Sequence, residues 1–218
     1  MSPEWVPGRQ SLSPAWLTSG VALLFALTVA VSAGSAHALQ VTEQDSPVAR
    51  SEAIRQVLLT PAQARRAGRF KLPLTADLMA GEQGRSCYGG TPTLTCDAWF
   101  TTDSTSAPYP KGVAITLSSS PAGAQEAFVQ LGERVKQSSD QEILVSTANL
   151  LISQQRGLAE GPSLVPAVSI TVHRIQDSAI VMGSCQVQER RLRMSQLRTC
   201  AQRLERAQGL RAVRLARG

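Results

Sequence analysis

The residues with the clearest chemistry in this 218-residue chain are four cysteines. They are Cys87, Cys96, Cys185 and Cys200. None of them forms a C-x-x-C pair, and the chain has only two histidines, so a zinc site with its four clustered nitrogen or sulfur ligands is not expected. The N-terminal segment described below predicts export, and an even number of cysteines in an exported chain indicates two disulfides instead.

The pairing of these cysteines depends on where the last helix begins. Cys87 and Cys96 flank the turn-rich segment 88–92, which favours a local bridge and leaves Cys185 with Cys200. That second bridge requires Cα atoms within about 7 Å, so the helix must begin late, near Ser195. In a helix that began at Val187, Cys200 would lie about 20 Å along the axis, and the bridges would have to cross. We favour the local pairing and keep crossed bridges as the alternative.

The chain contains residue types that can catalyse hydrolysis, but their positions in the sequence do not match a known catalytic pattern. A Ser-His-Asp site would have to use His173, the only histidine after residue 37. His173 follows Ser169 and Thr171 at alternate positions, which is typical of the polar face of a strand. Paired carboxylates can hydrolyse glycans, but Asp97 and Asp103 are interpreted as strand-end residues. Glu126 and Glu133 fit a solvated helix face.

Other catalytic signatures are missing from the sequence. It contains no G-x-S-x-G, no Walker motif and no G-x-G-x-x-G. We therefore assign no catalytic residue, no metal and no cofactor, and we do not expect an enzyme. A secreted hydrolase is the least favoured alternative.

Arginines are concentrated at the C-terminal end. Residues 190–218 hold nine arginines and one acid, whereas residues 39–189 are slightly acidic. Outside the cytoplasm such a segment would contact anionic lipid or a cell-wall polymer, although a solvated helix face is the simpler interpretation. Nucleic acid is not expected, because no aromatic residue lies among the arginines. The candidate residues for polyanion binding are Arg190, Arg191, Arg193, Arg198, Arg203, Arg206, Arg211, Arg214 and Arg217.

The N-terminus predicts export. No charged side chain occurs between Gln10 and Thr42, and this gap contains the apolar run Val21–Val31 and then Ala36-His37-Ala38. These features are typical of a signal peptide with an A-x-A cleavage site, and the alternative is an uncleaved anchor through residues 16–34. The expected organisation is a leader at 1–38, a linker at 39–50 and a single α+β extracytoplasmic domain at 51–218.

The elements of this domain follow from hydrophobic periodicity. Helices are expected over 51–59, from Thr60-Pro61 to residue 67, and from Ser120-Pro121 to residue 138, where Ala124, Phe128, Leu131 and Val135 form a stripe. Strands are expected over 97–102, 113–117, 168–173 and 179–182. A last helix follows through Met194, Leu197, Ala201 and Leu204, with a stop at Gly209. Segments 72–90, 104–112 and 157–166 are expected to be loops, and 141–156 favours a helix.

Strand, strand and helix thus occur twice, over 97–138 and 167–208. The predicted fold class is α+β, an antiparallel sheet with helices packed on one face, a ββα pseudo-repeat and two disulfides.

The segment Val57-Leu58-Leu59-Thr60-Pro61, and the strand that leads through residues 118–124 into a helix with Phe128, resemble a known class of proteins. These are the exported α+β domains of high-GC actinobacteria, including sensor-type ectodomains of receptor kinases and small envelope lipoproteins. The resemblance covers about residues 51–208. The chain differs from the lipoproteins because it lacks a lipid-acceptor cysteine, and from the receptor kinases because it lacks a kinase domain. It implies a domain that binds a component of the cell envelope.

We therefore expect a non-catalytic exported module for ligand binding or sensing, with an unknown envelope ligand. The expected contact residues are Trp99, Phe100 and Tyr109, because the loop 104–112 that follows Trp99 and Phe100 is long and carries Tyr109. The alternative is a structural envelope protein that uses the arginine-rich segment.

Overall fold

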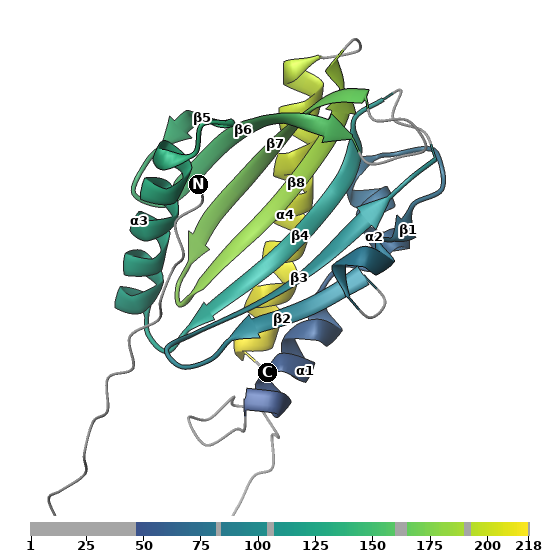
Figure 1. The fold of residues 1–218 in the computed structure, drawn as a ribbon. Helices are drawn as coiled ribbons and strands as arrows, with labels where there is room; N and C mark the ends of the chain where they lie inside the picture. The colour runs from purple at the N-terminus through teal and green to yellow at the C-terminus, as the bar shows by residue number, and fades with distance from the viewer. Residues whose placement is uncertain (1–46, 82–83, 104–106, 160–164, 190–192, 218) are drawn as a thin grey trace, which may run out of the picture. The chain divides into compact units, whose positions relative to one another are not determined.

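The sheet expected from the alternating segments is present and has eight strands, all paired antiparallel (Figure 1). The structure is a computed structural model and describes residues 47–81, 84–103, 107–159, 165–189 and 193–217. The strand order is β1-β3-β4-β8-β7-β6-β5, and β2 also pairs with β3. The elements along the chain are α1 (Pro47–Val57), α2 (Pro61–Gly68), β1 (Thr75–Ala76), η1 (Leu78–Ala80), β2 (Arg85–Gly89), β3 (Thr93–Thr101), β4 (Tyr109–Ser118), α3 (Pro121–Gln137), β5 (Gln141–Ser146), β6 (Leu150–Ala159), β7 (Val165–Gln176), β8 (Ala179–Gln188) and α4 (Met194–Arg217).

Different helices cover the two faces of the sheet. Successive side chains of a strand point to opposite faces, so Val181 of β8 lies on one face and Ile180 on the other. Helices α1, α2 and α4 pack against the face of Val181 and form the main core. Helix α3 packs Phe128 and Val135 against Ile180 and neighbouring residues on the opposite face. The α+β class is confirmed, and the structure adds a second, smaller layer to the expected one-sided cover.

The two strand-strand-helix units therefore pack differently. Both occur in the expected order, as β3-β4-α3 and β7-β8-α4. Their helices lie on opposite faces, because the apolar stripe of α3 meets Leu151 and Ile180 whereas that of α4 meets the main core. The expected pseudo-repeat extends to the order of the elements and not to their packing.

Helix α4 crosses β8 unusually closely. A Cβ atom at Gly183 would lie 2.4 Å from the backbone nitrogen of Glu205 and 2.6 Å from the carbonyl oxygen of Ala201. Only a glycine allows the helix backbone to come this near the strand. The bridge Cys185–Cys200, with Cα atoms 6.0 Å apart, joins the same two elements. Helix α4 begins at Met194, the late start that this bridge requires.

Both local disulfides are thus confirmed, since Cys87 and Cys96 also pair. These two cysteines lie directly opposite each other on β2 and β3. Two disulfides are compatible with an extracytoplasmic location.

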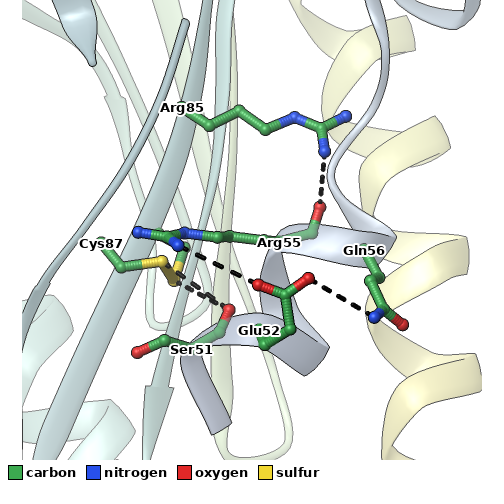
Figure 2. A network of polar contacts seen from close by, with 7 residues as sticks. Ser51, Glu52, Arg55, Gln56, Arg85 and Cys87 are labelled. Carbon is green, nitrogen blue, oxygen red and sulfur yellow. Dashed lines mark hydrogen bonds and ion pairs between the residues drawn. A yellow bond between two sulfur atoms is a disulfide. The ribbon is translucent and has the colours of Figure 1, made fainter. Parts of the chain in front are cut away.

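The middle of helix α1 rests on the Cys87–Cys96 disulfide (Figure 2). Both sulfur atoms lie 3.8 Å from the carbonyl oxygen of Ser51. One turn further on, the guanidinium of Arg85 on β2 donates a hydrogen bond of 3.1 Å to the carbonyl oxygen of Arg55. The helix therefore docks on the edge strand through its backbone.

The end of helix α1 is held by α4. The buried Gln208 donates to the carbonyl oxygen of Val57 (3.0 Å) and accepts from the backbone N–H of Leu59 (3.0 Å). Arg211 donates to the carbonyl oxygens of Val57 (3.4 Å) and Leu58 (3.3 Å). These bonds satisfy carbonyls that the helix end leaves free, with a positive charge at the negative end of the helix dipole.

Several expectations about the elements were wrong. The expected loops 104–112 and 157–166 are partly strand, since β4 begins at Tyr109, β6 ends at Ala159 and β7 begins at Val165. Segment 141–156 is not a helix but the hairpin β5–β6, because pairing with β7 extends the sheet and overrides helical periodicity. Segment 72–90 is not only loop, since it contains β1, η1 and β2. Helix α4 does not stop at Gly209, which packs against the side chain of Gln176 while the helix continues to Arg217.

The expected leader at 1–38 and anchor at 16–34 lie outside the described residues. Within the described ranges, no helix combines the length and apolar character needed to cross a membrane.

Candidate functional site

Part of the second sheet face is left without a helix. Helix α3 lies at one side of this face, and no described helix covers its middle, over β3, β4, β8 and β7 (Figure 1). The strand register sets out the side chains there. We call this area the open face and define it by Thr95, Asp97, Trp99, Thr116, Thr171, Met182 and Ser184.

Hydroxyl groups of the open face form two pairs across neighbouring strands. The Thr95 and Thr116 hydroxyls, on β3 and β4, lie 2.9 Å apart. The Thr171 and Ser184 hydroxyls, on β7 and β8, lie 3.1 Å apart. A hydroxyl can donate one hydrogen bond and accept two, so each pair retains hydrogen-bonding capacity in a fixed position.

A carboxylate lies at the β2 side of the open face. Asp97 is only 5 % exposed and accepts a hydrogen bond of 2.5 Å from the Ser86 hydroxyl. Burial, and then the negative charge of Asp97, raise the pKa of the neighbouring Tyr88. A buried carboxylate retains a strong demand for hydrogen-bond donors.

The indole of Trp99 lies beside these polar groups. Gly112 on β4 is its direct cross-strand partner. A Cβ at residue 112 would come within 2.6 Å of the indole ring, so the ring occupies the space that a side chain at residue 112 would need. Trp99 is partly exposed, which leaves part of a rigid aromatic surface accessible.

His173 lies at the boundary between the open face and α3. Burial, and then the positive charge of Arg134 on α3, lower its pKa to about 4. Its Nδ1 atom is buried and has no hydrogen-bond partner among the described residues. A triad histidine needs a carboxylate at Nδ1, so the geometry does not support the hydrolase alternative.

The structure separates the three expected contact residues. Phe100 points to the main core and is 1 % exposed. Tyr109 is also in that core, with its ring centroid 6.2 Å from that of Phe70. The expectation that these two form a contact surface was wrong, because the strand alternation and the start of β4 at Tyr109 bury them. Of the three residues, Trp99 remains a candidate contact residue. Residues 104–106 of the expected loop lie outside the described part of the chain.

The structure does not bring the carboxylate candidates together as catalytic pairs. Glu133 forms an ion pair with Lys136 (2.6 Å), and Glu126 accepts from Gln130 (3.3 Å). Asp97 is buried within β3, whereas Asp103 is exposed beyond its end. In the described ranges, no group of three or more His, Cys, Asp or Glu residues could hold a metal ion.

The arginine candidates fall into three classes. Arg190, Arg191 and the side chain of Arg217 lie outside the described part of the chain. Arg211 is engaged with the end of α1, and burial lowers its pKa. Arg193, Arg198, Arg206 and Arg214 are exposed and Arg203 is partly exposed.

Sequence reasoning missed most of the open face. The available signal was the polar residues that alternate with apolar ones in the strands, such as Thr95, Thr116 and Ser184. In the sequence, this pattern indicates only an ordinary solvated strand face. Only the strand order β3-β4-β8-β7 places these positions side by side.

No protein-family model and no curated protein matches the chain.

Proposed function

We propose that the protein is a non-catalytic, extracytoplasmic module that binds a polar envelope ligand on its open face. The observation that carries this proposal is the combination of paired hydroxyls, a buried carboxylate and a partly exposed indole on one uncovered sheet face. This role agrees with the resemblance to exported sensor-type domains.

The chemistry of the open face favours a ligand with several hydroxyl or amide groups. Hydroxyl pairs can both donate and accept, and the Asp97 carboxylate accepts. The flat indole of Trp99 can cover an apolar ring face of the same ligand. Rigid strands hold all these groups, which lowers the entropy lost on binding.

Tryptophan fluorescence can test this proposal. The chain has three tryptophans, and replacing Trp5 and Trp16 by phenylalanine leaves Trp99 as the only one. This full-length variant is titrated with soluble peptidoglycan fragments and with neutral envelope oligosaccharides. We expect a saturable change in Trp99 emission with one of these classes.

Two further variants locate the site. Thr171→Val with Ser184→Ala removes one hydroxyl pair and should weaken the binding about thirty-fold, since two hydrogen bonds to the ligand are lost at about 1 kcal/mol each. Thr199→Val, an exposed position on α4, is the matched control and should bind normally. Equal affinity of both variants would contradict a site on the open face.

A further inference from the structure

Helices α2 and α4 lie side by side on the covered face of the sheet. Leu59, just before α2, bonds to Gln208 of α4. At the other end of α2, a Cβ at Gly68 would lie 3.5 Å from the Cys200 sulfur. Helix α2 therefore runs alongside α4 between residues 208 and 200, and the outer sides of the two helices form one surface.

This surface collects arginines from distant parts of the sequence. Ala64 is the buried residue of α2, and Arg65, Arg66 and Arg69 are exposed. On α4, Arg203, Arg206 and Arg214 follow one another at helical spacing on the side away from the buried Leu204. We call these six residues the basic helical surface.

No exposed acid balances these charges on α2 or on the described part of α4. Glu205 is the one acidic residue there, and it is 0 % exposed. It accepts a hydrogen bond of 3.0 Å from Arg174 on β7. The opposite side of the molecule differs, since α3 carries Glu126 and Glu133 together with its basic residues.

An apolar side chain lies within the arginine stripe. Leu210 occupies the same side of α4 as Arg206 and Arg214 and is 67 % exposed. Arginines around an exposed leucine suit a bilayer interface, where headgroups meet the charges and the leucine enters the acyl boundary. A fully hydrated polyanion would leave Leu210 in water.

We propose that the basic helical surface docks on an anionic phospholipid bilayer. This site is distinct from the open face, which lies on the other side of the sheet. Each basic residue near an anionic surface contributes about a five-fold factor to binding. Arg211 does not take part, because it bonds to the end of α1.

The test compares two doubly substituted full-length chains that lose the same charge. Arg206→Gln with Arg214→Gln removes exposed arginines from α4, and Arg134→Gln with Lys136→Gln removes exposed charges from α3. Binding is measured by co-sedimentation with phosphatidylcholine vesicles with and without phosphatidylglycerol. The vesicles without phosphatidylglycerol report any contribution of the apolar N-terminal segment, which all variants share.

We expect the α4 variant, which loses two arginines, to lose about 25-fold in affinity for phosphatidylglycerol vesicles and the α3 variant to bind like the parent chain. Equal losses would show non-specific attraction and overturn the proposal. Circular dichroism melting verifies that both variants are folded.

Leu210→Gln separates a bilayer from a soluble polyanion. This variant keeps every charge, so we expect a several-fold loss on vesicles and unchanged binding to inorganic polyphosphate. If Leu210→Gln binds vesicles as tightly as the parent chain, or if the parent binds polyphosphate more tightly than vesicles, the partner is a soluble polyanion and the bilayer proposal fails.

Discussion

Single residues on the two sheet faces carry different kinds of polar chemistry. On the covered face, polar groups such as Gln208 bond to the protein and hold helices together. On the open face, the Thr95–Thr116 and Thr171–Ser184 pairs keep hydrogen-bonding capacity, and their threonines are partly exposed whereas Ser184 is buried. The first set explains stability, and the second supports the binding proposal.

His173 should make the protein sensitive to mild acid. Its pKa is about 4 in the folded chain against about 6.5 when unfolded. Between pH 6.5 and pH 4 the unfolded state therefore binds more protons than the folded state. The contribution of His173 to the unfolding free energy is complete above pH 6.5 and is lost as the pH falls towards 4. Relative to His173→Gln, the parent should lose about 2 kcal/mol of unfolding free energy across this range.

Urea unfolding of both chains at several pH values measures this difference. The contributions of groups that titrate alike in the parent and in His173→Gln cancel in the difference between their unfolding free energies. Curves of stability against pH that stay parallel between pH 6.5 and 4 would show that His173 has an ordinary pKa.

At the scale of elements, the crossing of α4 over β8 depends on one missing side chain. The backbone of α4 occupies the place where a Cβ of residue 183 would lie. A helix backbone cannot yield as the end of a flexible side chain can, so Gly183 sets the separation of the two elements.

Gly183→Ala should therefore lower the unfolding free energy by about 3 kcal/mol, since overpacking against backbone forces α4 to shift. Gly132→Ala on α3 is the control, because a Cβ there meets nothing within 4 Å. It should stabilise the protein by about 0.5–1 kcal/mol through helix propensity. Urea midpoints at constant m-value measure both changes. Equal behaviour of the two variants would disprove the close approach.

At the scale of the whole molecule, the two disulfides anchor different parts of the helical layer. Cys185–Cys200 ties the first turns of α4 to a central strand. Cys87–Cys96 closes the edge pair β2–β3, on which the middle of α1 rests. Each closes a short loop, so similar gains in stability are expected.

Removing either bridge by a double Cys→Ala substitution should cost about 2–4 kcal/mol, but the local effects should differ. Loss of Cys185–Cys200 should speed hydrogen exchange in residues 194–200, and loss of Cys87–Cys96 should speed it in residues 85–89 and 51–57. Exchange that rises equally everywhere in both variants would show that the bridges do not act locally.

The sequence by itself determined the features that rest on local chemistry. Thr60 caps α2 and Ser120 caps α3, as their side-chain hydrogen bonds confirm. The α+β class also followed from periodicity, and spacing favoured the local disulfides together with the late start of α4 that they require.

Only the tertiary structure decided how distant segments meet. The hairpin β5–β6 reads as helix until its pairing with β7 is known. Phe100 and Trp99 are neighbours in sequence, yet one enters the core and the other lies on the open face, because the cover of each sheet face is set by helices elsewhere in the chain. Arginines of α2 and α4 share a surface for the same physical reason: long-range packing, which no local pattern records, chooses the neighbours.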